Sequence, residues 1–178
     1  FNTFDAIKFA PPETVNQTLR DALDIARDPK APLDERAENL EVYKQLKTKA
    51  DAMKQAIDDD AVGYIEGIEN RSLSVAERIE KQRMLGVEEN KIVPFSMQEF
   101  KDFKGSLETD DPIFAMQEMD AFRRKYFLNQ TYYIKTASEQ EKLALELIAS
   151  AKGKDITLSM DQARLQAEGI IKQNDAAG

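Results

Sequence analysis

The chain has 178 residues, the usual length of one domain, and a third of them are charged, which is typical of long solvated helices. Cysteine, histidine and tryptophan are absent, which excludes disulfides, thiolate chemistry, cysteine or histidine metal ligands and a histidine general base. Any catalysis would therefore use carboxylate, lysine, tyrosine or serine side chains. The net charge of −8 opposes binding to nucleic acid and to anionic membranes unless basic residues cluster.

The ends and the apolar runs of the chain suggest where it resides. No apolar run reaches the length of a membrane span, and no signal peptide is recognisable. We therefore expect a protein that is cytoplasmic or held within a macromolecular assembly. Because the first residue is Phe1 rather than Met, we also expect a segment of a longer protein or a processed product.

Apolar residues recur at helical spacing along the whole chain, so we predict an all-α protein, a multi-helix array or bundle of about six to eight helices. In chain order, the predicted helices span residues 12–27, 34–57, 62–70, 74–85, 96–104, 112–135, 138–152 and 159–173. The two long helices are 34–57 and 112–135. Residues 174–178 are expected to fray.

Helix starts and ends are marked by capping residues. Four serines are each followed three residues later by Glu or Gln, which is the spacing of the capping box. In this motif the serine hydroxyl accepts a hydrogen bond from the backbone N–H of the Glu or Gln. The side chain of that Glu or Gln accepts one from the backbone N–H of the serine. These serines are Ser74, Ser96, Ser138 and Ser159. Asp111 before Pro112 predicts a fifth start, and Gly86 and Gly153 predict two helix ends.

The chain is expected to form a single helical domain, 1–178, or two subdomains. The two would be an extended helical part, 1–86, and a more aromatic helical core, 95–178, joined by the linker 87–94. Nine of the 14 aromatic residues lie in the second half, so the better-packed core is expected there. Pro94 disfavours helix at the preceding residue, which predicts a short extended piece in this linker.

An acidic stretch, residues 58–69, has the spacing of a calcium-binding loop, with Gly63 at the sixth position, where such a loop turns sharply. The stretch resembles the loop of the EF-hand family, which implies Ca²⁺ as a ligand. The implied metal ligands are Asp58, Asp60, Tyr64 and Glu69. The stretch departs from the family at position five, where Val62 offers no side-chain oxygen, and the chain has no second loop to pair with it.

The same acidic stretch also fits a helix boundary. Three aspartates at a helix C-terminus oppose the helix dipole, whereas at an N-terminus they are favoured. Asp60 is therefore predicted to cap the helix that follows, and we prefer this interpretation. On this interpretation we expect neither a metal ion nor a cofactor.

A second candidate is a basic and aromatic strip, residues 122–135, which has four basic residues, five aromatic residues and no acid. Such a strip can stack on bases and bind phosphates, or lie on a membrane surface. It can equally be a core helix whose cations face water, and we favour this because the acidic chain repels phosphates. The partner-binding candidates are Arg123, Arg124, Lys125, Tyr132 and Tyr133.

A third candidate is the acidic cluster of Glu108, Asp110 and Asp111. Paired carboxylates can act as acid and base in glycoside hydrolysis or hold Mg²⁺. Directly before a helix start, however, negative charge is favoured by the dipole alone. We favour this structural role.

The composition and the long charged helices together suggest a function. We expect a non-enzymatic helical structural or interaction module within a larger protein or assembly, such as a scaffold, an adaptor or a virion-type structural protein. Protein partners or self-association are expected, and nucleic acid is not. The alternatives are a carboxylate-based enzyme fragment, a Ca²⁺-responsive helical module, and a nucleic-acid binder acting through residues 122–135.

Overall fold

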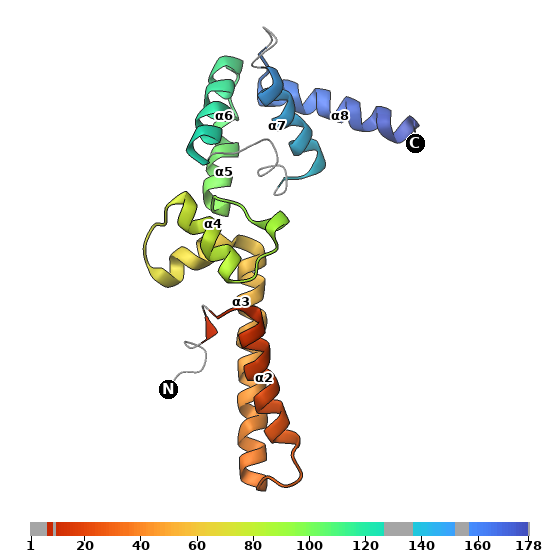
Figure 1. Cartoon of the computed structure of the whole chain (residues 1–178). Coiled ribbons are helices and arrows are strands. Elements are labelled where there is room, and N and C mark those ends of the chain that lie inside the picture. Colours follow the sequence, from red (N-terminus) through yellow and green to blue (C-terminus); the bar gives the residue numbers. More distant parts are fainter. Residues whose placement is uncertain (1–6, 9, 127–136, 152–156, 178) are drawn as a thin grey trace. The chain divides into compact units, whose positions relative to one another are not determined.

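The computed structural model of the chain describes residues 7–8, 10–126, 137–151 and 157–177, and within these ranges it is all-helical, as the sequence predicts, with no strand. The α-helices are α2 (Pro12–Arg27), α3 (Leu33–Glu69), α4 (Val75–Met84), α5 (Met97–Ser106), α6 (Pro112–Tyr126), α7 (Glu139–Ala151) and α8 (Met160–Ala177), with a 3₁₀ turn at Glu89–Lys91 (Figure 1). Among the described helices, none combines the length and the apolar composition needed to cross a bilayer.

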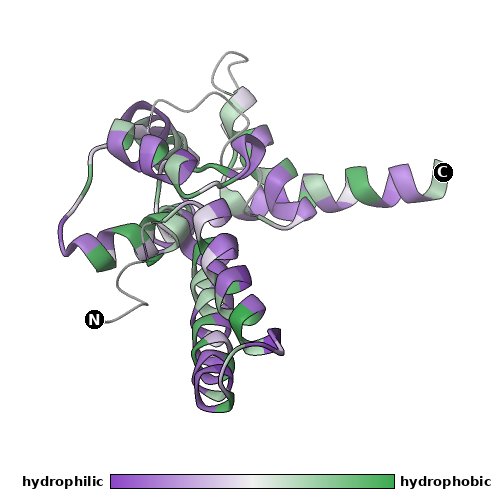
Figure 2. Ribbon diagram, turned by 60° about the horizontal axis from the view of Figure 1, so that its bottom comes forward, coloured by the Kyte–Doolittle hydropathy of each residue, from purple (hydrophilic) through white to green (hydrophobic). Residues whose placement is uncertain are grey.

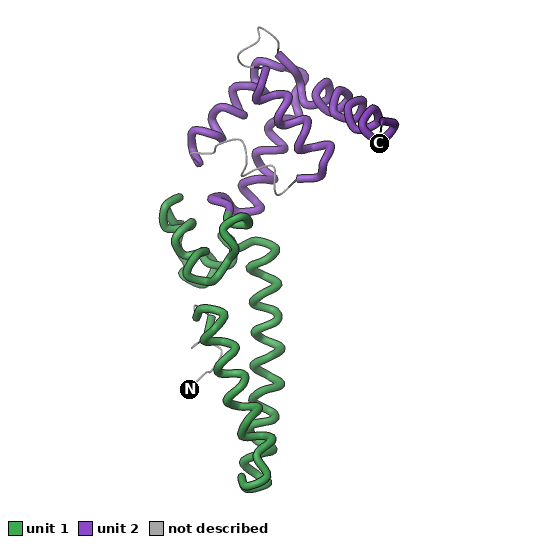
Figure 3. Tube along the Cα trace, turned by 45° about the vertical axis from the view of Figure 1, so that its right-hand side comes forward, with its two compact units in different colours: residues 1–92 green, residues 93–178 purple. Residues whose placement is uncertain are grey.

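The chain divides into two compact units, residues 1–92 and 93–178 (Figure 3). The division lies inside the segment 87–94, which the sequence marks as a linker. This segment is not an exposed tether, because Ile92, Val93 and the residues directly after them are buried. It also forms no strand; Ile92 has extended backbone angles and follows the 3₁₀ turn.

In the first unit, α2 and the first part of α3 form an antiparallel helical hairpin (Figures 1 and 3). Pro29 stops α2, and the Asp28 carboxylate then accepts a hydrogen bond of 2.9 Å from the Lys30 N–H, which closes the turn. The buried core of the hairpin consists of Ile7, Val15, Leu46, Ala50 and Met53. All of these lie away from the turn, and no side chain from residue 23 to residue 45 is buried.

The long helix α3 is interrupted at a single residue, Asp60, whose backbone angles of −159° and 82° are not helical. The Asp60 carboxylate accepts a hydrogen bond of 3.0 Å from the Gly63 N–H, which is the geometry of an N-cap. The predicted cap at Asp60 is thus confirmed. The predicted gap after residue 57 is wrong, because one non-helical residue is enough to start the second part of the helix.

We expect this cap to determine the effect of changing Gly63. A Cβ at Gly63 would lie 2.1 Å from the Asp60 carboxylate, so G63A must displace the cap. In the wild-type background, G63A should gain about 1 kcal/mol of stability from the higher helix propensity of alanine. It should lose a similar free energy because the Asp60 cap is displaced. In the D60A background the same change should stabilise by about 1 kcal/mol.

Urea unfolding of the four proteins in this double-mutant cycle measures that coupling. Equal effects of G63A in both backgrounds would contradict it. Because D60A alone removes the cap, it should cost about 1 kcal/mol, and D59A provides the matched control at the neighbouring exposed acid.

Helix α4 packs against α3 in the same unit, and both of its ends follow the predicted signals. Ser74 and Glu77 form both hydrogen bonds of the capping box at its start. Gly86 follows its end with φ of +79°, the left-handed conformation that favours glycine. A Cβ at Gly86 would lie 2.6 Å from the ring of Pro12, so this glycine also allows the close approach of α2.

The core of the second unit is aromatic. Phe122 of α6 stacks on Phe103 of α5 at a centroid distance of 3.9 Å, and it also contacts the rings of Phe95, Phe100 and Tyr126. The Tyr126 hydroxyl donates to the Glu99 carboxylate, which also takes part in the capping box at Ser96. These rings all lie in the aromatic second half; that this half is the better packed of the two stays a prediction.

Helices α7 and α8 pack against each other. Small residues on both helices, Ala144, Ala163 and Ala167, are fully buried. The predicted caps at Ser138 and Ser159 are present, since each hydroxyl accepts from the backbone N–H three residues later. Helix α8 runs to Ala177, so the predicted fraying from residue 174 is wrong; a Glu168–Lys172 ion pair supports this exposed end.

The predicted long helix 112–135 is described only as far as Tyr126. Residues 127–136 lie outside the described part of the chain, and so do Tyr132, Tyr133 and Gly153. The predicted helix start is present, because the Asp111 carboxylate accepts from the Ile113 N–H at 3.0 Å.

Candidate functional site

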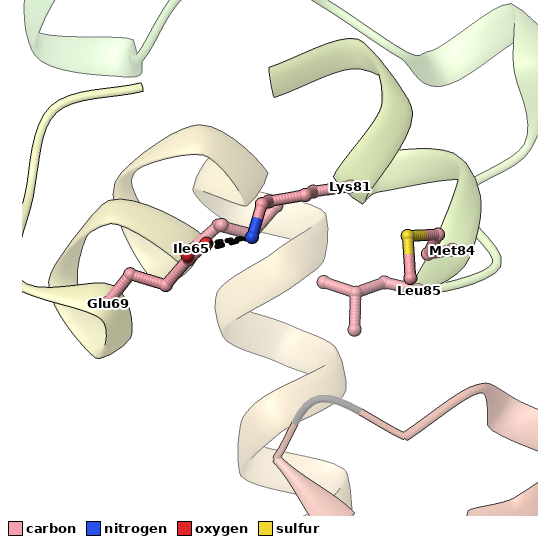
Figure 4. A pocket seen from close by; sticks show the side chains of 5 residues that line it. All are labelled: Ile65, Glu69, Lys81, Met84 and Leu85. Atoms are coloured by element: carbon pink, nitrogen blue, oxygen red, sulfur yellow. Dashed lines mark hydrogen bonds and ion pairs between the residues drawn. The ribbon is translucent and has the colours of Figure 1, made fainter. Parts of the chain in front are cut away.

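A pocket of about 170 Å³ lies between α3 and α4 (Figure 4). Its lining side chains are Ile65, Glu69, Lys81, Met84 and Leu85. Figure 4 shows the Lys81 ammonium directed at the Glu69 carboxylate, and the two groups are 2.7 Å apart. The pocket is smaller than the roughly 300 Å³ at which ligand sites begin, so it has room for about one apolar side chain.

The Glu69–Lys81 pair belongs to an ion-pair network that joins the end of α3 to α4. Arg71 contacts both Glu69 at 3.2 Å and Glu77 at 2.8 Å. Deeper in the unit, the nearly buried Arg78 guanidinium donates to the Glu66 carboxylate at 3.0 Å. Glu66 also accepts from the Leu73 N–H at 2.7 Å, so it fixes the connection between the two helices as well.

Two carboxylates of this network, Glu69 and Glu77, have a lowered pKa because they pair with cations. Hydrogen bonding to Lys81 lowers the pKa of Glu69 below its ordinary value of 4.5, and Arg71 adds to the shift. Hydrogen bonding to Arg71 likewise lowers the pKa of Glu77. The pairs join residues of α3 to residues of α4, so the network holds the two helices together.

This network predicts acid sensitivity of the fold. Since the folded pKa of Glu69 lies below the unfolded value of 4.5, the unfolded state binds more protons between the two values. The stabilisation is complete above pH 4.5 and is lost as the pH falls through the folded pKa. We expect the free energy of unfolding to decrease less between pH 5 and 3 in K81M than in the wild type.

Urea unfolding at several pH values measures this difference. Other carboxylates titrate in the same range, so the informative quantity is the difference between variants. K101M, at an exposed lysine, is the matched control and should retain the wild-type pH dependence. An identical pH dependence in K81M would contradict the assignment.

The four residues implied by the EF-hand resemblance lie along α3 rather than around a loop. Asp58 is exposed, Asp60 caps the second part of the helix, and Glu69 pairs with Lys81. The Tyr64 hydroxyl donates to the Lys8 carbonyl at 2.9 Å, and burial raises its pKa. Within the described ranges, no three carboxylates converge in a way that could hold a metal ion.

The acidic cluster before α6 is spread over separate roles. Glu108 pairs with Arg164 of α8, while Asp111 caps α6. Each of these two carboxylates thus has a structural partner, and the third member of the cluster, Asp110, is exposed.

The described part of the basic strip lies in the last turn of α6. Arg124 and Lys125 are exposed and Arg123 is half-buried. In the described residues none of the three has an ion pair, whereas Arg71, Arg78, Arg83 and Arg164 all pair with carboxylates. Lys125 lies over the Tyr126 ring, with its ammonium nitrogen 5.3 Å from the ring centroid.

The end of the α2–α3 hairpin combines exposed apolar side chains with an excess of acidic ones. We call residues 21–42 the hairpin end; they include seven acidic and three basic residues, a net charge of −4. Leu33 is 79% exposed and Leu40 40% exposed, and Ile25 and Val42 are exposed nearby. Figure 2 shows hydrophobic positions interrupting the hydrophilic ones on both helices of the hairpin.

Sequence reasoning missed both the α3–α4 network and the exposed hairpin end. Arg78 and Glu66 are twelve residues apart, so no intrahelical spacing indicates their contact. The exposure of Leu33 and Leu40 depends on which face of α3 is covered by α2. Comparison of the chain with protein-family models, curated proteins and solved structures found no match.

Proposed function

We propose that the chain is a non-enzymatic helical interaction module of a larger protein or assembly, and that the hairpin end is the surface that binds a protein partner. The observation that supports this most is the exposed apolar stripe of Leu33, Ala37 and Leu40. These residues recur at i, i+4 and i+7, so they share one face of α3. Single exposed apolar residues are ordinary, but a stripe of them favours docking.

The charges beside this stripe support binding of a specific partner rather than nonspecific hydrophobic association. Asp34, Glu38 and Glu41 have the same spacing and are all exposed, so they form an acidic stripe along the apolar one. Interfaces combine an apolar centre with a polar rim in this manner. A scaffold, an adaptor or a virion-type structural protein would use such a surface to join its assembly.

Site-specific photo-crosslinking tests the proposal. A photoreactive amino acid at position 33 or 40 of the full chain, expressed in its native cells, should crosslink to one defined protein, a second copy included. The same group at position 55, also exposed on α3, is the matched control. L40E should reduce recovery of the crosslinked protein from position 33 by about tenfold, because it places a charge in the apolar centre.

Two results would overturn the proposal. One is a chain that sediments as a monomer and yields no crosslinked species from positions 33 and 40. The other is the same set of species from position 55, which would indicate nonspecific contact.

A further inference from the structure

The outer face of α6 is apolar at one end and cationic at the other. Ile113 is 54% exposed and Phe114 43% exposed, while Arg124 and Lys125 are exposed at the far end. Ile113 and Arg124 are separated by about three helical turns, as are Phe114 and Lys125, so each pair lies on one line along the helix. Gln117 and Ala121, between them, are exposed and uncharged.

Basic residues outnumber acidic ones at the cationic end of this face, where Asp120, one turn before Arg124, is the nearest acid along the helix. Residues 121–138 contain four basic residues and no acid. Within the described residues, Arg124 has no carboxylate partner, although the chain has an excess of acids over bases. Glu118 and Asp120 are half-buried and lie toward the edges of the face rather than at its centre.

The hairpin end carries the complementary charge. Its exposed apolar residues Leu33 and Leu40 lie beside the exposed acids Asp34, Glu38 and Glu41, which extend about 11 Å along α3. On α6, the exposed Phe114 precedes Lys125 by about 16 Å. The two surfaces can therefore bring apolar residues together and place the acids of one within reach of the long Arg124 and Lys125 side chains of the other.

We propose that the outer face of α6 in one copy of the chain binds the hairpin end of a second copy. This inference rests on the proposed function, since it names a second copy as the partner. The contact joins two different surfaces, so it is heterologous, and each copy retains one further surface for another contact. Repetition of the contact closes a ring or extends a filament.

Charge reversal in the full chain tests the contact by analytical ultracentrifugation over a concentration series. R124E/K125E and E38K/E41K should each weaken self-association by about tenfold or more, because each places like charges together. An equimolar mixture of the two variants should restore association, because the reversed surfaces are complementary to each other. Association of the wild type should also weaken as NaCl is raised.

The control separates local complementarity from net charge. K54E/K101E changes the net charge by the same amount as R124E/K125E but alters exposed lysines outside both surfaces. It should retain wild-type association. Circular dichroism spectra of all variants should match, since every changed side chain is exposed.

Three outcomes would overturn the inference: a wild-type chain that stays monomeric, association that persists in R124E/K125E, or a mixture that fails to recover. Binding of a labelled oligothymidine that R124E/K125E abolishes, without self-association, would assign the face to nucleic acid instead. The proposed function survives these outcomes if positions 33 and 40 crosslink to a different protein. It fails separately if they crosslink to none.

Discussion

We expect F122A to destabilise the second unit by about 3–5 kcal/mol, more than any other single substitution predicted for this chain. Phe122 is buried and its ring contacts four others, with the Phe103 ring stacked on it at 3.9 Å. Truncation removes this apolar area from the core and leaves a cavity that helices on both sides hold open. Pairwise ring contacts add about 0.5–1.5 kcal/mol each to the loss of burial.

Urea unfolding followed by circular dichroism measures this loss, at a protein concentration low enough that association makes no contribution. F114A is the matched control, because Phe114 lies on the same helix but is 43% exposed, and its effect should stay near or below about 1 kcal/mol. Similar losses for F114A and F122A would show that the ring cluster is not the core of this unit.

We expect the second largest effect from R78M, which should destabilise the first unit by about 3 kcal/mol. Arg78 donates to Glu66 at 3.0 Å, and their side chains are 7% and 18% exposed. The substitution keeps most of the side-chain volume. It removes the positive charge that offsets the cost of burying the Glu66 carboxylate. Breaking such a pair by removing one partner costs more than removing both, because an uncompensated charge remains.

The double variant E66Q/R78M separates the cost of an unpaired charge from the loss of contact. The glutamine can still accept from the Leu73 N–H, so the double variant should be more stable than R78M alone. R83M is the matched control, because the Arg83–Glu89 pair is exposed and screened by solvent, so its loss should reduce stability far less than R78M does. If E66Q/R78M is less stable than R78M, the network does not depend on charge compensation.

Local signals in the sequence were sufficient to predict the helix caps, because a cap depends on residues that are close together in the chain. The capping boxes at Ser74 and Ser96, the cap at Asp111 and the left-handed Gly86 all lie where the sequence predicts them. A cap satisfies backbone groups within one turn of itself, so its residue types and spacing are visible without tertiary information.

One helix boundary differs from the prediction because a local signal has two physical solutions. The cap at Asp60 is confirmed, but one non-helical residue is enough to start the second part of α3, so the predicted gap between residues 57 and 62 is absent. The division between the two units does fall inside the predicted linker, 87–94. The burial of Ile92 and Val93 does not follow from periodicity, because it depends on what packs against the segment.

The all-helical class, most helix boundaries, the caps and the absence of cysteine and histidine chemistry all follow from the order of residues along the chain. Packing between helices set which residues meet: the Glu66–Arg78 pair, the ring cluster around Phe122, and the exposure of Leu33 and Leu40. The physical reason is that helix propensity and capping act over one or two turns. Burial and ion pairing depend on contacts between helices, and their partners are not set by spacing along the chain.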